Sequence, residues 1–245
     1  MSNSFTYRGY DMSAYGLIVK SREIPMQHDI DALNLHYRAF ATDSKIIPKT
    51  ISLSVAVTAA TVVTLKTNLD TIKRILNTQT DETLILDSLT DRYWKARFKN
   101  LSGVFKVLTF DGNVEFLCLD PYAYGTSLIS NDYDDAAEPA TINETPGGTA
   151  LIEPIFTLTS SVDDGAADIK VNNTTLGMEI EWTGAITIGA KLEIDSSLWH
   201  VSLDGVASMA TVSGQWPVLS PGVVNIIEVY GFTGNVNILY RNKYA

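Results

Sequence analysis

Two pairs of carboxylates stand two residues apart on predicted strands, Glu179 with Glu181 and Glu193 with Asp195. Such residues share one face of a strand at roughly 7 Å, and glycoside hydrolysis uses two carboxyl groups about 5 to 9 Å apart. That reaction needs its two carboxyl groups opposed across the scissile bond, whereas both members of each pair would point out from one face. We therefore interpret the pairs as part of the acidic outer face of a β-sandwich.

The other residues capable of metal or nucleophilic chemistry lack the spacing that such chemistry requires. His28 and His36 stand eight residues apart with no other His or Cys at ligand spacing, and His200 has no nucleophile motif beside it. The acidic run 132–135 lacks the glycine turn and the late Glu of a calcium loop, so a solvated loop is expected. Cys118, the only cysteine, lies in a predicted strand and is interpreted as a small buried hydrophobe. The sequence predicts no catalytic residue, no metal site and no cofactor.

Tryptophans of the C-terminal half could stack on sugar rings. Trp182 and Trp199 are predicted to lie on the apolar faces of their strands and to be buried in the core, which points His200 outward. Trp216 lies in a loop rich in Gly and Pro, and it is the one tryptophan that we keep as a candidate glycan contact.

The chain of 245 residues is acidic, with a formal net charge of −10. Sequence-independent binding to nucleic acid needs clustered Lys and Arg, so stable nucleic-acid binding is not expected. The part up to Thr149 has 14 Lys and Arg against 18 Asp and Glu, and the rest has 4 against 10, which spreads the acidity over both halves. Without a signal peptide or a run of about 18 apolar residues, the chain is expected to be made in a cytoplasm and to stay out of membranes.

The predicted fold class is mainly β with one α-helix. Four apolar residues recur at helical spacing over 61–77, and Thr61 is the predicted N-cap. From Ala150 onward, short alternating stretches are separated by turn signals such as Asp204-Gly205, which is typical of a β-sandwich. The helical stripe consists of Leu65, Leu69, Ile72 and Leu76.

Two domains are expected. Residues 136–149 are polar and contain Pro139, Pro146 and a Gly pair, a composition typical of a linker. The predicted organisation is an N-terminal domain over 1–135, a linker over 136–149 and a C-terminal β-sandwich over 150–245.

Residues 104–125 predict a hairpin that completes the first domain. Asp111-Gly112 stands between two apolar runs, the strongest short-range signal for a hairpin turn. Asp120-Pro121 is expected to end the second strand, because proline has no N–H to donate. Tyr122 and Tyr124 follow.

This stretch, with its FLCLDPYAY ending, resembles the end of the N-terminal domain in the distal tail protein family of long-tailed, non-contractile bacteriophages. The order of features elsewhere is similar too: an aromatic-x-aromatic-x-Gly start followed by Tyr-Gly-Leu, and GQWPVLSPG at 214–222 near the end. The positions that carry the family pattern are Tyr7, Gly9, Gly16, Asp120, Pro121, Tyr122, Pro221 and Gly222.

One segment departs from the family pattern. Family members often carry a Gly-rich loop over the region of residues 26–50, and this chain has no glycine there. Apolar residues alternate instead, and we interpret the segment as a hairpin arm or edge strand to which a neighbouring subunit could add strands. Its apolar residues are Leu33, Leu35, Tyr37 and Phe40.

The resemblance implies a structural protein of the virion, located at the tail tip or baseplate, and not an enzyme. It implies a ring, usually a hexamer, formed by a β-sandwich-like N-terminal domain with one helix, with galectin-like C-terminal domains projecting outward. Such a ring joins the tail tube to the tail-associated hub or lysin protein, and receptor-binding proteins could attach at its periphery. The acidic chain would then line a channel to which DNA does not adhere.

Two other functions stay open on the sequence alone. The C-terminal domain could be a carbohydrate-binding module for host glycans, with Trp216 as a contact. A hydrolase using Glu179 and Glu181 is the third hypothesis.

Overall fold

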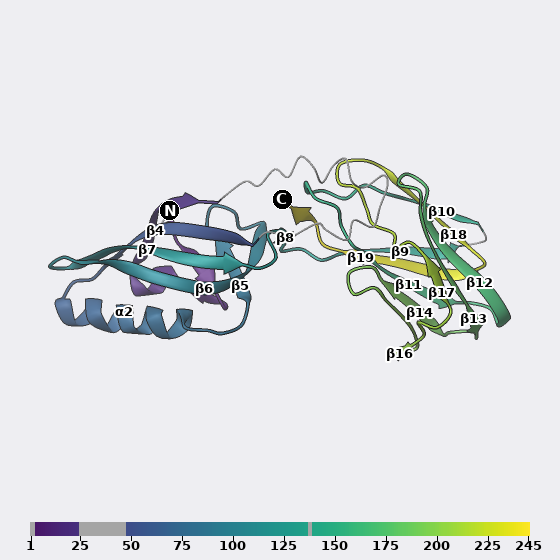
Figure 1. Cartoon of the computed structure of the whole chain (residues 1–245), viewed down its shortest axis with the longest axis horizontal. Helices are drawn as coiled ribbons and strands as arrows, with labels where there is room; N and C mark the ends of the chain where they lie inside the picture. Colours follow the sequence, from purple (N-terminus) through teal and green to yellow (C-terminus); the bar gives the residue numbers. More distant parts are fainter. Residues whose placement is uncertain (1–2, 25–47, 137–138) are drawn as a thin grey trace. The chain divides into compact units, whose positions relative to one another are not determined.

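The computed structural model describes residues 3–24, 48–136 and 139–245, which divide into two compact units (Figure 1). The division falls between Thr126 and Ser127, so unit 1 precedes it and unit 2 follows it. The predicted arm, with Leu33, Leu35, Tyr37 and Phe40, lies outside the described residues. Among the described residues, no helix has the length and apolar character needed to cross a bilayer.

Unit 1 is built on an antiparallel sheet with the strand order β2-β1-β5-β6-β7-β4-β3, and β8 pairs with β6. One α-helix, α2, lies along one side of this sheet (Figure 1). The elements are β1 (Phe5–Tyr7), β2 (Tyr10–Asp11), the 3-10 helix η1 (Met12–Tyr15), β3 (Leu17–Glu23), β4 (Lys49–Thr58), α2 (Val62–Leu76), β5 (Glu82–Leu86), β6 (Arg92–Phe105), β7 (Thr109–Cys118) and β8 (Ala123–Gly125).

The sheet of unit 1 curls around its own core. The ring of Phe116 on β7 lies 5.6 Å from that of Phe5 and 5.1 Å from that of Tyr7, centroid to centroid. Phe5 and Tyr7 are both on β1, which is three strands away from β7 in the sheet order. In a flat sheet, strands so placed would lie about 14 Å apart. All three side chains are fully buried, so the aromatic alternation at the N-terminus serves the core.

The helix confirms its sequence pattern. The four residues of the predicted stripe are all buried, and the Thr61 side chain accepts a hydrogen bond of 3.1 Å from the backbone N–H of Thr64. Thr61 is therefore the N-cap, and it satisfies one of the N–H groups that the first helical turn leaves unpaired.

The predicted turn at Asp111-Gly112 is wrong. The β6–β7 hairpin turns at residues 106–108, and Asp111 and Gly112 lie inside β7 opposite Val104 and Gly103. A Cβ on Gly103 or Gly112 would come closer than 3.0 Å to backbone oxygens of the facing strand and to the Phe110 ring. Gly112 therefore allows two strands to approach each other closely, whereas in a turn a glycine would be needed for its freedom of φ.

Unit 2 is a β-sandwich, as predicted. A five-stranded sheet in the order β10-β18-β12-β13-β17 and a six-stranded sheet in the order β16-β15-β14-β11-β19-β9 share one hydrophobic core. The strands of the two sheets are β9 (Ile129–Ala136), β10 (Ala140–Glu144), β11 (Ile155–Ser160), β12 (Asp164–Asn173), β13 (Met178–Ile186), β14 (Lys191–Asp195), β15 (His200–Leu203), β16 (Val206–Ala207), β17 (Val212–Gly214), β18 (Asn225–Tyr230) and β19 (Gly234–Tyr240). The last strand of the chain, β20 (Lys243–Tyr244), belongs to neither sheet.

Strands occupy much of the region predicted as acidic loop and linker. The acidic run 132–135 lies in β9, which pairs with β19, and β10 falls within the predicted linker and pairs with β18. In β10, Ala140, Ile142 and Glu144 are buried while the two residues between them are exposed. Only one of these three is a large apolar residue, so the polar composition hides a strand with regular alternation.

Candidate functional site

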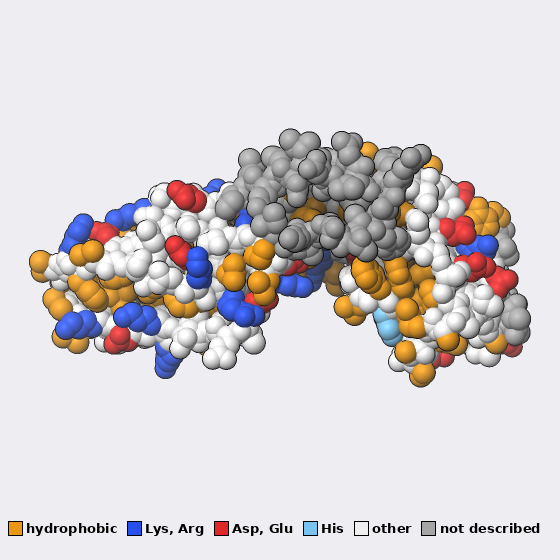
Figure 2. Space-filling view, viewed as in Figure 1, with side chains coloured by type: hydrophobic (Ala, Val, Ile, Leu, Met, Phe, Trp, Pro, Cys, Tyr) orange, Lys and Arg blue, Asp and Glu red, His pale blue; other side chains and the backbone are white. Residues whose placement is uncertain are grey.

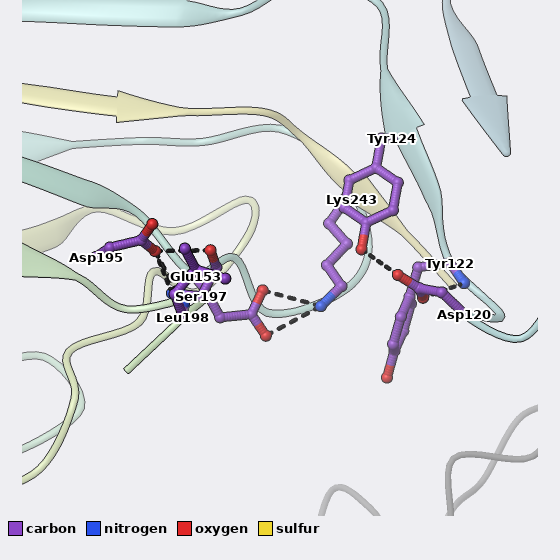
Figure 3. A network of polar contacts seen from close by, with 8 residues as sticks. All are labelled: Asp120, Tyr122, Tyr124, Glu153, Asp195, Ser197, Leu198 and Lys243. Carbon is purple, nitrogen blue, oxygen red and sulfur yellow. Dashed lines mark hydrogen bonds and ion pairs between the residues drawn. The ribbon is translucent and has the colours of Figure 1, made fainter. Parts of the chain in front are cut away.

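The carboxylate pairs do not form a catalytic site. Glu179 and Glu181 lie on the outer face of β13, where the Lys170 amine stands 3.9 Å and 3.6 Å from their carboxylates. Asp195 is buried and stabilises a turn: its carboxylate accepts hydrogen bonds from the N–H groups of Ser197 at 2.8 Å and Leu198 at 3.0 Å (Figure 3). Within the described ranges, no group of three or more His, Cys, Asp or Glu side chains is arranged to hold a metal ion.

The family-pattern positions of unit 1 have structural roles. The Tyr7 hydroxyl donates to the carbonyl oxygen of Ala96, and Gly9 and Gly16 adopt left-handed φ angles of 79° and 72°. The Asp120 carboxylate accepts from the backbone N–H of Tyr122, at 3.1 Å, and from the hydroxyl of Tyr124 (Figure 3). Pro121 lies between β7 and β8 inside this polar turn.

The loop 214–222 of unit 2 is held in place by buried amides. Asn225, fully buried, donates to the carbonyl of Ser220 at 2.9 Å and accepts from its N–H at 2.8 Å. Just beyond, Pro221 leads into Gly222, whose N–H donates to the carbonyl of Pro146 at 2.8 Å. Trp216 is half-buried and packs against the hydrophobic core of unit 2.

Trp199 is the clearest error of the sequence interpretation. Trp182 is buried as predicted, but Trp199 is 64% exposed and precedes β15 with a left-handed φ of 53°. Strand β15 begins at His200, so the apparent alternation of Trp199, Val201 and Leu203 runs across a turn. A bulky residue with a left-handed φ is uncommon, and no local sequence pattern predicts this conformation for Trp199.

Trp199 belongs to an exposed apolar surface along β15 and β16, at the edge of the six-stranded sheet. The backbone N–H of Val201 donates to the sulfur of Met209 at 3.1 Å, which brings Met209 beside β15. Figure 2 shows hydrophobic side chains gathered near β14 and β16. We call this surface the edge patch; it comprises Leu198 (74% exposed), Trp199, Val206 (71%) and Met209 (41%).

A second exposed apolar surface lies at the tip of the β6–β7 hairpin. The N–H of Ala59 donates to the carbonyl of Leu108 at 3.2 Å, which joins the hairpin tip to the start of α2. Lys106 and Lys20 both pair with Asp111 beside the hairpin tip. Their hydrogen bonds to its carboxylate, chiefly the one from Lys106, lower the pKa of Asp111 to about 2. We call this surface the hairpin patch; it comprises Val62, Val63, Val104, Phe105, Val107 and Leu108, which are between 41% and 80% exposed.

The two units differ strongly in charge. Residues 1–126 contain 14 Lys and Arg against 13 Asp and Glu, a net charge of +1, whereas residues 127–245 contain 4 against 15, a net charge of −11. Figure 2 accordingly shows Lys and Arg side chains over the visible face of unit 1 and few on unit 2. The expectation of evenly spread acidity depended on the division at Thr149 and is wrong for the units of the structure.

A buried carboxylate that the sequence analysis did not single out lies inside unit 2. The Glu144 side chain accepts hydrogen bonds from Tyr133 at 2.6 Å, Asn131 at 2.8 Å and Tyr240 at 3.1 Å, and the residue is 3% exposed. These bonds tie β10 of one sheet to β9 and β19 of the other. Its position at the third buried site of a short alternating strand is the only sequence signal that could have found it.

We expect this network to make unit 2 sensitive to alkali. Burial, followed by the nearby Glu144 charge, raises the pKa of Tyr240 to about 12, and burial also raises the pKa of Tyr133. The unfolded chain loses these phenolic protons near pH 10, so the stabilisation present below pH 10 is lost progressively up to about pH 12. In urea unfolding, the stability difference between the wild type and Tyr240→Phe should shrink between pH 9 and pH 11. A difference that stays constant from pH 9 to pH 11 would contradict this assignment.

Comparison with known proteins finds a family match within unit 2 and a similar fold for the whole chain. Residues 147–244 match the family described as siphovirus-type tail component, C-terminal domain. The crystal structure of Dit from phage SPP1, described as a paradigm of the hub adsorption apparatus in phages infecting Gram-positive bacteria, superposes with a TM-score of 0.76 at 14% identity, covering 100% of both chains. A chain of the phage P2 baseplate in its Ca-activated conformation gives a TM-score of 0.47 at 9% identity, covering 99% of this chain and 98% of that one. No curated protein matches in sequence.

Proposed function

Because residues 147–244 belong to the siphovirus-type tail components and the whole chain has the fold of SPP1 Dit, we propose that this protein is the distal tail protein of a phage tail tip. It is a structural component of the virion baseplate and not an enzyme. The family match of residues 147–244 is the observation that carries this conclusion, and the full-length fold similarity extends it to unit 1.

We further propose that the protein works as a ring, with six copies, between the tail tube protein and the hub protein of the tail. The near-neutral charge of unit 1 supports its role as the ring-forming part, because six copies can come together without strong repulsion. The net charge of −11 favours placing the copies of unit 2 apart, at the periphery. Receptor-binding proteins would attach there.

This arrangement changes the expectation about the channel. The acidity that was expected to keep DNA from adhering is located in unit 2, and unit 1 has a net charge of +1. A channel lined by unit 1 would therefore be nearly neutral overall.

The proposed ring predicts a defined mass and shape. Light scattering on the purified chain, with and without the tail tube protein of the same phage, should give a particle of six times 26.8 kDa. Negative-stain images should show a central hole. A compact monomer at every concentration, with the tube protein present as well as absent, would contradict the proposal.

A further inference from the structure

The edge patch of unit 2 continues the core-facing side of the six-stranded sheet beyond the part that the sandwich buries. Residues paired across neighbouring strands share one face of a sheet, and Leu192, Leu203 and Val206 are paired in this way across β14, β15 and β16. Along this row Leu192 is fully buried, Leu203 is half-buried against the core, and Val206 is 71% exposed. The core of unit 2 is therefore uncovered where this sheet ends.

We propose that the edge patch is a docking surface for another protein of the tail periphery, which contributes an apolar segment flanked by Lys or Arg. This inference rests on the proposed function, which places the copies of unit 2 at the outside of the ring, and it names the surface and the chemistry of a partner there. In that arrangement unit 1 makes the ring contacts, so the edge patch is left for a different protein.

Trp199 is exposed at a cost to the backbone. Its φ of 53° lies in the left-handed region, where a bulky residue is strained, and strain of this kind clusters at ligand-binding and active sites. The residue is 64% exposed, so burial within unit 2 does little to offset the strain. Tryptophan is also among the residue types that dominate the binding energy of protein interfaces. Both features favour a binding role for Trp199 over a role in the core.

The patch is carried by an ordered turn and an anchored loop. The buried carboxylate of Asp195 accepts hydrogen bonds from the N–H groups of Ser197 and Leu198, which fixes the turn before β15 (Figure 3). The indole N–H of the buried Trp182 donates to the Ser208 hydroxyl at 2.9 Å, which anchors the loop after β16. Little ordering of the patch is therefore needed when a partner binds.

The side chains of the patch favour a protein partner over a glycan. Sugar hydroxyls that lose water on binding need hydrogen-bonding partners, because an unpaired buried hydroxyl is costly. Trp199 could stack on a sugar ring, but the aliphatic side chains of Leu198 and Val206 offer no such partner. An apolar segment of a protein meets the same surface without this cost.

The charge of unit 2 favours a basic partner and disfavours a second copy. Residues 195–209, which carry the patch, contain two Asp and no Lys or Arg, and unit 2 has a net charge of −11. Two edge patches placed face to face would bring these like charges together, whereas Lys or Arg beside the apolar segment of a partner would complement them.

The size of the patch fits a contact that is repeated around a ring. Its four side chains expose on the order of 500 Å², comparable with the largest apolar patch of a typical monomer. With an equal area from the partner, about 1,000 Å² would be buried, near the lower limit for a specific interface. A ring of six copies presents six such contacts, so a partner that engages several of them at once gains avidity.

Binding of the full chain to the purified receptor-binding protein of the same phage, measured by biolayer interferometry, tests the patch. Val206→Asp should weaken this binding at least tenfold, because it places a carboxylate in the apolar surface and adds to the negative charge. Val223→Asp is the matched control: the same change is made at a position of unit 2 that is 46% exposed and outside the patch, and binding should equal that of the wild type. Both variants should form the same ring as the wild type in light scattering.

Trp199→Gly separates binding from stability. Glycine adopts a left-handed φ without strain, so unit 2 of this variant should unfold close to the urea concentration at which the wild type unfolds. The same variant should bind the receptor-binding protein at least tenfold more weakly. A large drop in the unfolding midpoint would show that Trp199 supports the fold, and would overturn its assignment to the docking surface.

Loss of binding to the receptor-binding protein in variants that still form the ring supports the inference. It is overturned if the wild type does not bind that protein, if Val206→Asp and Trp199→Gly bind it as the wild type does, or if either variant no longer forms the ring. Binding of soluble host cell-wall polysaccharide that Trp199→Gly abolishes would also overturn it, because the patch would then be a glycan site. A wild-type chain that forms no ring rejects the proposed function, and the comparison of variants in binding then decides the docking surface separately.

Discussion

Replacing Glu144 with alanine should lower the free energy of unfolding of unit 2 by about 3–5 kcal/mol. The substitution leaves three donors without their acceptor, the buried hydroxyl of Tyr240 and the partly buried hydroxyl of Tyr133 and amide of Asn131. Each buried donor that loses its partner costs about 1–3 kcal/mol, and the members of a shared network do not add independently. The loss should therefore be several times that of an average substitution.

Tryptophan fluorescence during urea unfolding measures this effect, because Trp182, Trp199 and Trp216 are all in unit 2 and only Trp94 is in unit 1. Glu179→Ala is the matched control: the same side chain is removed from the same unit, but its carboxylate is exposed and 3.9 Å from Lys170. It should change stability by less than about 0.5 kcal/mol. If the two variants unfold at the same urea concentration, the Glu144 network does not hold the two sheets together.

Long-range pairing decides which of two identical dipeptides becomes a turn. Asp204 and Gly205 adopt φ angles of 50° and 77° and connect β15 to β16, as their sequence predicts. Asp111 and Gly112 occur between equally alternating residues, yet they lie in mid-strand. The difference lies in Gly103 on the facing strand, since only two opposed glycines allow the strands to approach beneath the Phe110 ring. The sequence around a dipeptide contains no information about which residue of the neighbouring strand will pair with it.

The predictable part of the molecule is the part in which local pattern and tertiary burial agree. The stripe of α2, the alternation of β1 and β13 and the sandwich class of unit 2 follow from periodicity. Trp199 and Glu144 do not, because the exposure of an aromatic residue and the burial of a carboxylate both depend on strands that meet only in the fold. The charge difference between the units also depends on the fold, because it appears only when the chain is divided at Thr126, before β9.

Replacing Gly112 with alanine should destabilise unit 1 by about 3 kcal/mol and open the end of the β6–β7 hairpin. The added Cβ would come closer than 3.0 Å to the backbone oxygen of Ser102 and to the Phe110 ring. Overpacking of a well-packed site typically costs about 1–3 kcal/mol, and a backbone oxygen cannot rotate away as a side chain can. Hydrogen exchange should show faster exchange of the amides of residues 101–113, together with a lower melting temperature of unit 1.

Two companions make the test of the glycine pair specific. Ser102→Ala alters the neighbouring position without adding a Cβ and should leave exchange unchanged. Combining Gly103→Ala with Gly112→Ala should cost less than the sum of the two single variants, because the strands that the first methyl group separates already leave room for the second. Strict additivity would mean that the two glycines act independently, and the hairpin patch would then not depend on their close approach.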